Sequence, residues 1–249
     1  MFGTELKRWR AARRYTQEAL AAEAAVSPRH LSCLERGVAW PSEAMVLRLA
    51  RALDLPLRER NAMLSAAGYA ARWSDSGDRV PERLHAATQR LLHGQPWPTF
   101  ALSGTYLVLD ANAAGTAMLA ALVPGPVVGM DMARTFLGEG PHRAMIENYD
   151  EAAASFLARL RADAAAQGPA SPLWAVIDEA GEPSTGAAVP AEPALALTIR
   201  VGGRRTRWLT VLMSFGSAQD AMVEQLTIEQ FLPADDETAA FARAMAAPA

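Results

Sequence analysis

The chain has 249 residues, 51% of them hydrophobic, with a formal net charge of −3 and a single cysteine, Cys33. That size and apolar content suffice for two small domains with separate cores, and one cysteine excludes an intramolecular disulfide or a cysteine-based zinc cluster. No apolar run approaches the ~18 residues that a membrane helix needs, and the start MFGTELKRWR has no signal-peptide pattern, so we expect a soluble cytoplasmic protein with no metal site.

Residues 1–72 have the pattern of five short helices, the second over about 16–24 and the third over 28–36. The expected boundaries carry residues that start or end helices, namely Thr16, Ser27, Pro28, Gly37, Ser42, Pro56 and Gly68. This part has 12 basic and 7 acidic residues, a net +5, whereas the remainder has 12 and 20, a net −8. The asymmetry suggests that only the N-terminal part meets a polyanion, although solvated helices that carry arginine fit the count about as well.

The second and third helices have the spacing of a helix-turn-helix. Leu20 and Ala21 on the first of them face Leu31 and Leu34 on the second across a three-residue bend, and the second helix can enter a major groove. Turning these leucines inward leaves an outward face that predicts DNA contacts. The candidate DNA-binding residues are Thr16, Gln17, Ser27, Pro28, Arg29, His30, Ser32, Cys33, Arg36 and Trp40. The alternative is an ordinary helical hairpin with a solvated arginine face.

These candidates suit different parts of a DNA duplex. Arg29 and His30 suit base edges, because arginine bonds guanine O6 and N7 together and histidine donates to purines. Gln17, beside the free N–H groups of a helix start, suits a phosphate, and Arg36 with the segment near Trp40 suits the flanking backbone. Arg10 and Glu35 are candidates for a buried ion pair between the first and third helices.

This segment resembles the XRE family of Cro and phage-repressor DNA-binding domains over about residues 3–68. The matching residues are Arg10, the run Thr16-Gln17-Glu18-Ala19-Leu20-Ala21, Val26-Ser27, Leu31, Leu34-Glu35-Arg36-Gly37, Pro41 and Leu49-Ala50-Arg51-Ala52-Leu53. The resemblance implies a recognition helix that begins at Ser27 and a homodimer bound to a roughly palindromic double-stranded DNA operator. Ala25 departs from the family, whose bend usually has glycine, and a left-handed alanine there costs about 1 kcal/mol.

Residues 73–97 are expected to form a linker and a connecting helix, and residues 98–249 a second domain. The first half of this domain is expected to have two strands around Ser103-Gly104, a helix from Asn112 and a helical middle over 131–167. The segment SPLWAVIDEA is ambiguous between helix and strand, and a Pro/Gly-rich loop follows over 181–193. The domain is expected to end with a hairpin around Gly202-Gly203, a third strand in VEQLTIEQFLP and a closing helix capped by aspartate. The fold class is therefore two domains, one all-α and one α+β with a mainly antiparallel sheet and helices gathered on one side.

The strand-to-helix entry TYLVLDANAAGTAML resembles those of PAS-like domains, and the tail SFGSAQDAMVEQLTIEQFLPADDETAAF resembles the C-terminal region of MmyB-like XRE regulators. The resemblance implies a PAS-like second domain with an apolar pocket for a fatty-acid-like or other small hydrophobic effector. The candidate ligand-binding residues are Phe100, Tyr106, Asn112, Met118, Phe136, Tyr149, Phe156, Trp174, Met213 and Phe215. Each large apolar side chain is explained equally by an ordinary core position. Ser214, Asn112 and Tyr149 suit a polar head group or, alternatively, capping and core hydrogen bonds.

The sequence has no Walker loop, G-x-S-x-G, H-E-x-x-H or G-x-G-x-x-G motif after a strand, so we expect no enzyme and no cofactor beyond an effector. The leading hypothesis is a DNA-binding regulator whose second domain binds that effector, dimerises, or does both. The alternative is a regulator whose second domain only dimerises or docks a protein.

Overall fold

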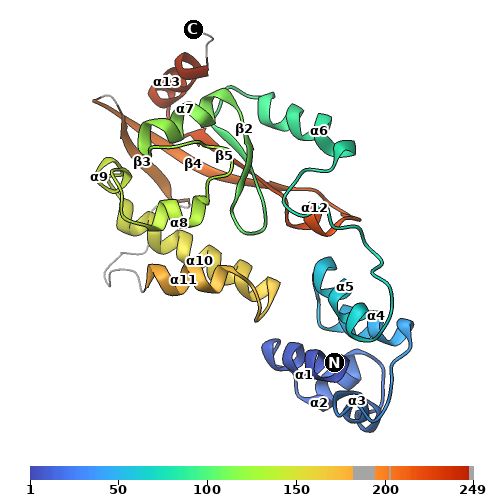
Figure 1. Ribbon diagram of the computed structural model, residues 1–249. Coiled ribbons are helices and arrows are strands. Elements are labelled where there is room, and N and C mark those ends of the chain that lie inside the picture. Colours follow the sequence, from blue (N-terminus) through green and yellow to red (C-terminus); the bar gives the residue numbers. More distant parts are fainter. Residues whose placement is uncertain (182–193, 202, 247–249) are drawn as a thin grey trace.

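The structure is a computed structural model that describes residues 1–181, 194–201 and 203–246 (Figure 1). Its N-terminal part, here called the head, comprises the five helices α1 to α5. Their bounds are α1 Phe2–Ala12, α2 Gln17–Glu23, α3 Pro28–Glu35, α4 Glu43–Ala52 and α5 Leu57–Ala66. Leucines from α1 to α4 meet in one core, in which Leu6, Leu20, Leu31, Leu34 and Leu49 have no exposed surface. The predicted all-α domain of five helices is therefore confirmed.

The helices of the head begin and end at the residues that the sequence marks. The hydroxyl oxygens of Thr16, Ser27 and Ser42 accept hydrogen bonds of 3.1, 3.2 and 3.3 Å from the backbone N–H groups three residues later, as N-caps do. In the bend between α2 and α3, Ala25 has a φ of 50°, and Gly37 after α3 has a φ of 72°. The predicted caps and the left-handed alanine are confirmed, and the bend keeps its shape at a local cost.

The remainder, here called the body, is an α+β domain around a five-stranded sheet. Its bounds are α6 Glu82–His93, β1 Thr99–Leu102, β2 Val108–Ala111, α7 Ala113–Leu122, α8 Met132–Leu137, α9 His142–Met145, α10 Tyr149–Gln167, α11 Leu173–Ala180, β3 Ala196–Val201, β4 Arg204–Ser214, α12 Ala221–Gln225, β5 Thr227–Pro233 and α13 Asp236–Ala246. The strand order is β2-β1-β5-β4-β3 and each neighbouring pair is antiparallel. The predicted α+β class and antiparallel sheet are confirmed, and the ambiguous segment SPLWAVIDEA contains the helix α11.

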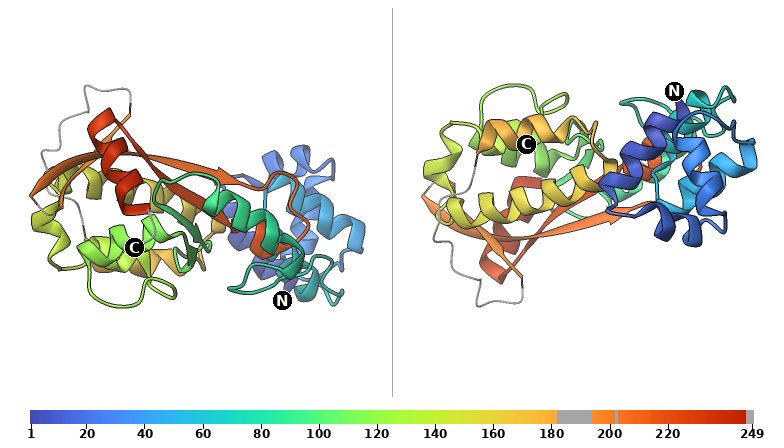
Figure 2. Two further views of the ribbon diagram at one scale, coloured as in Figure 1. Left: turned by 90° about the horizontal axis from the view of Figure 1, so that it is seen from above. Right: turned by 90° about the horizontal axis from the view of Figure 1, so that it is seen from below.

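The expectation that helices gather on one side of the sheet is wrong in part. Phe100 and Leu102 of β1 pack into a core with α10 and α11. Ala101 between them packs with Ile228 against α6 and α12, on the opposite face (Figures 1 and 2). Because successive strand residues point to opposite faces, this second apolar face needs a cover of its own, and α6 with α12 provides it.

The end of the sheet follows the sequence prediction closely. β3 and β4 pair in register from Ala196 with Leu209 to Val201 with Arg204, which confirms the predicted hairpin, although its Gly202 lies outside the described residues. Residues 182–193 of the predicted Pro/Gly-rich loop also lie outside the described residues. Asp235 accepts a 2.8 Å hydrogen bond from the backbone of Thr238, so the closing helix has its predicted aspartate cap. Among the described helices, none is long and apolar enough to cross a membrane.

Candidate DNA interface and ligand cavity

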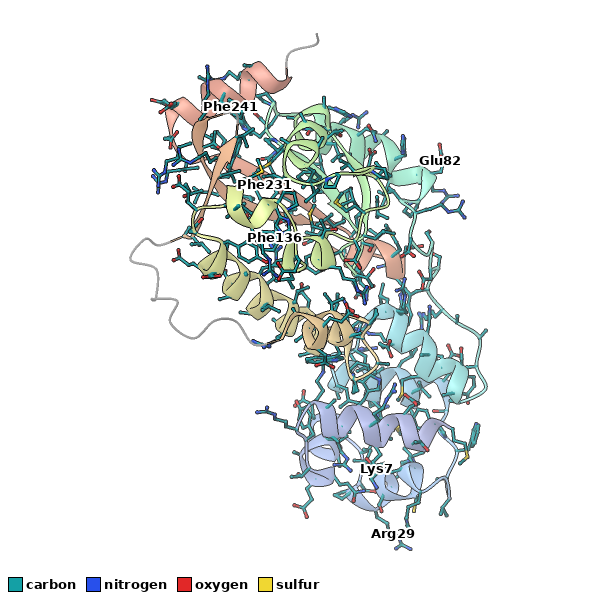
Figure 3. All side chains as sticks on the ribbon, turned by 60° about the vertical axis from the view of Figure 1, so that its left-hand side comes forward. Lys7, Arg29, Glu82, Phe136, Phe231 and Phe241 are labelled. Carbon is teal, nitrogen blue, oxygen red and sulfur yellow. The ribbon has the colours of Figure 1, made fainter. Side chains whose placement is uncertain are left out.

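The outward face of α3 lies at the end of the molecule. Pro28, Arg29 and Arg36 are exposed, and His30, Ser32 and Cys33 between them are half-buried. Arg29 points away from the body at the far end of the head (Figure 3). The helix is held from behind by Leu31 and Leu34. The structure therefore brings the predicted recognition residues together on one accessible surface.

A bidentate ion pair behind α3 joins the first helix to the third. Arg10 donates to the two carboxylate oxygens of Glu35 over 2.6 and 3.0 Å, and the two side chains are only 15% and 3% exposed. This confirms the predicted buried pair. Burial alone would raise the pKa of Glu35, but hydrogen bonds from Arg10 and Gln17 outweigh it and lower that pKa.

Three of the predicted DNA-binding residues also form side-chain hydrogen bonds within the head. The side-chain amide of Gln17 donates to Glu35 over 2.7 Å, so it is oriented by the ion pair. Arg36 donates to the carbonyl of Ser32 over 3.3 Å and lies along α3. Trp40 donates its indole N–H to the carbonyl of Ala67 over 3.0 Å, while 65% of the residue stays exposed. Thr16 remains exposed beside the start of α2.

The body contains a cavity of about 340 Å³ between α7, α8, α10 and the strands β3 to β5. Its wall is mostly apolar, and Phe136 and Phe231, which Figure 3 labels, approach it from α8 and β5. The wall is formed by Met118, Leu119, Leu122, Val123, Met132, Thr135, Phe136, His142, Ile146, Ala152, Ser155, Phe156, Arg159, Ala194, Leu195, Leu197, Leu209, Thr210, Leu212, Glu229 and Phe231. Three sequence candidates, Met118, Phe136 and Phe156, lie in it.

The other ligand candidates are not part of this wall, although Phe100 and Tyr149 pack against its residues Phe231 and Phe136. Phe100 is in the core beneath α7. Asn112 caps α7 through Gly115, 2.8 Å away. Tyr149 and Trp174 donate to backbone carbonyls, those of Phe136 and Gly168 respectively. The last three candidates, Tyr106, Met213 and Phe215, line clefts between head and body.

Sequence reasoning missed a charged pair in the cavity wall. Arg159 of α10 donates to Glu229 of β5 over 3.1 Å, and Glu229 is 4% exposed. Burial raises the pKa of Glu229 in spite of the neighbouring guanidinium. The guanidinium also lies over the ring of Phe156, 4.8 Å from its centroid. Successive residues of β5 point to opposite faces of the sheet, so Glu229 and Phe231 share one face. This alternation is the sequence feature that could have indicated Glu229 as a wall residue.

Head and body meet at the C-terminal end of α10 (Figure 2). Arg13, directly after α1, donates to the carbonyls of Ala165 and Ala166 over 2.7 and 2.9 Å. The same guanidinium donates to Leu53 and Asp54 after α4, over 3.0 and 3.2 Å. It thus joins the C-terminal ends of two helices, where carbonyls and the helix dipole favour a cation.

Beside these hydrogen bonds of Arg13, the indole of Trp9 lies directly against Gly168. A Cβ atom on Gly168 would lie 2.6 Å from Cζ3 of the indole and closer to its neighbouring atoms. A further bond runs from the backbone N–H of Leu57 to Glu224 of α12 over 2.6 Å. A cleft of about 690 Å³ lies around these contacts and shares Leu212 and Glu229 with the wall of the apolar cavity.

A head that presents a recognition helix, joined to a body with a mostly apolar cavity, defines a DNA-binding transcription regulator with a ligand-binding domain. The comparisons with known proteins agree. The family model of the MmyB-like transcription regulator ligand binding domain matches residues 84–245, and a helix-turn-helix domain model matches residues 1–63. The chain belongs to the MmyB-like transcription regulators.

No curated protein matches the chain. Among solved structures, one match is titled as the structure of an RNA-binding light-oxygen-voltage receptor, with 14% identity and a TM-score of 0.28. The match covers 97% of this chain, which spans only 61% of that receptor chain.

Proposed function

We propose that the chain binds an operator as a homodimer and that a small hydrophobic effector, fatty-acid-like or of another apolar kind, binds in the cavity of the body. The observation that carries this proposal is the apolar cavity of about 340 Å³, which lies within the size range of small-molecule sites. The outward residues of α3 support the DNA part. Two such helices in a dimer would lie about one DNA turn apart, roughly 34 Å, on a palindromic site.

We further propose that α10 links effector binding to DNA binding. Phe156 and Arg159 of α10 lie in the cavity wall, and Ala165 and Ala166, two turns further along, accept the hydrogen bonds of Arg13 from the head. A ligand that shifts α10 therefore acts on the joint directly. It changes operator affinity only by its differential binding to the two domain arrangements.

The effector is tested with a variant that closes the cavity from its mouth. Ser155 lines the cavity and is exposed, whereas Ala158 on the same helix is exposed and outside the wall. We expect decyl-chain compounds to raise the melting temperature of the wild type and of Ala158→Trp, but not of Ser155→Trp. Native mass spectrometry of the same samples gives the ligand stoichiometry and the oligomeric state. If Ser155→Trp responds like its control, the effector binds elsewhere or not at all.

The DNA interface is tested by selecting bound sequences from a random library with the full chain. We expect Arg29→Ala to lose its preference at one base position, because arginine reads base edges. Arg83→Ala removes the same charge from an exposed position of α6 in the body and serves as the control. Unchanged preferences for Arg29→Ala would refute the role of Arg29.

A further inference from the structure

Arg159 and Glu229 form a charged pair in a mostly apolar wall. Their contact of 3.1 Å uses one N–H of the guanidinium, and the Nε–H of Arg159 is buried with no hydrogen-bond partner among the described residues. A buried donor without a partner costs about 1–3 kcal/mol. A carboxylate also accepts more bonds than the single one that Glu229 receives here. The pair thus offers a ligand both a free donor and an acceptor.

The charges around this point are already balanced. In the described wall, Arg159, Glu229 and His142 are the titratable side chains, and Glu229 neutralises Arg159. Asp163, one turn along α10, also attracts the guanidinium of Arg159 and accepts a 2.6 Å hydrogen bond from Tyr106. A ligand anion would therefore add a net negative charge to a mostly apolar wall, where an uncompensated charge is costly. A neutral polar group adds hydrogen bonds without that cost.

We propose that Arg159 and Glu229 select an uncharged head group on the effector, one that accepts from Arg159 and donates to Glu229. Primary amides, alcohols and carboxylic acids that enter with their proton have this chemistry, and carboxylate anions do not. The inference rests on the proposed effector function, because it assigns a head group to the ligand of that cavity. Of the two ring nitrogens of His142, Nε2 faces the carbonyl of Phe136 at 2.9 Å, and Nδ1 is buried with no hydrogen-bond partner among the described residues and lies beside Gly140.

Three probes with one chain length test the selection in the full-length wild-type protein. Titration calorimetry at pH 8 compares decanamide, decanoate and decanol. A carboxylic acid with a pKa of about 4–5 is ionised at pH 8 to more than 99%, so we expect decanoate to bind at least 100-fold more weakly than decanamide. Between pH 8 and pH 6, the affinity for decanoate should rise about tenfold per unit. The affinity for decanamide should stay constant, and this series also controls for titration of the protein.

Decanoate that binds at pH 8 as tightly as decanamide overturns the head-group assignment and leaves the cavity's function standing. Binding of none of the three probes overturns the proposed effector function and this assignment together. The decisive variant is Glu229→Gln, which leaves Arg159 without its counter-charge, and we expect its preference to move toward decanoate by at least tenfold. Glu139→Gln, with a side chain that is 87% exposed, should keep the wild-type preference. The pH series of the wild type decides the question by itself if Glu229→Gln does not fold.

Discussion

Replacing Gly168 by alanine should loosen the joint between head and body. Gly168 has φ 102° and ψ −172°, a region that costs a residue with a Cβ about 1–3 kcal/mol. In addition, the new methyl would lie 2.6 Å from Cζ3 of Trp9, whereas carbon atoms pack at about 3.5–4 Å. Trp9 is 1% exposed, so its ring cannot turn aside without leaving the core of the head. Overpacking of this kind costs about 1–3 kcal/mol more, and moving the two domains apart relieves it.

Gly181→Ala is the matched control for this effect. Gly181 ends α11 with φ 72° and ψ −167°, and a Cβ there meets no atom of the described residues within 4 Å. Both variants are therefore destabilised by the strained backbone conformation, and only Gly168→Ala adds a clash with Trp9. We expect small-angle scattering to show a larger radius of gyration for Gly168→Ala alone, and amide exchange to rise in residues 165–168. If the two variants have the same scattering and the same loss of stability, the joint does not depend on Gly168.

Further predictions concern the head. Arg10→Met should destabilise the protein by about 3–5 kcal/mol in a urea titration, because it leaves the carboxylate of Glu35 buried and unpaired; loss of less than 1 kcal/mol would contradict this. The Arg10 pair lowers the pKa of Glu35, so its contribution is complete above the unfolded value and disappears as pH falls through the folded value. The deficit of Arg10→Met measured at pH 7 should accordingly shrink in acid below about pH 4. Arg29→Ala should lose about 1–3 kcal/mol of affinity for a selected operator, and an equal loss on random DNA would contradict base readout.

The features predicted well from the sequence are those that neighbouring residues determine. Ser27 caps the helix that it precedes, and Ala25 is left-handed because the bend and both flanking helices are fixed within a few residues. The Arg10 and Glu35 pair was also predictable, because the packing of short helices in the head leaves few places for a buried charge. Local rules of this kind do not need the rest of the fold.

The cavity wall was harder to predict because distant segments form it. Arg159 is indistinguishable in sequence from a solvated helix residue until β5 places Glu229, 70 positions later, against it. Phe100 has the same apolar pattern as Phe136, yet it packs beneath α7 while Phe136 lines the cavity. Apolar periodicity identifies the buried face of a helix or strand, but it does not show whether that face packs in a core or lines a cavity.

The proposed coupling through α10 requires only a small change at the joint. Helix α10 has 19 residues, and its rise of 1.5 Å per residue makes it roughly 28 Å long, so it moves as a stiff unit. A tenfold change in operator affinity corresponds to about 1.4 kcal/mol. A hydrogen bond to a charged group contributes about 1.5–3 kcal/mol, so the loss of a single bond from Arg13 to Ala165 or Ala166 in one domain arrangement supplies that difference. Arg13→Gln should therefore reduce the effect of a decyl-chain ligand on operator affinity, although the cavity still binds the ligand.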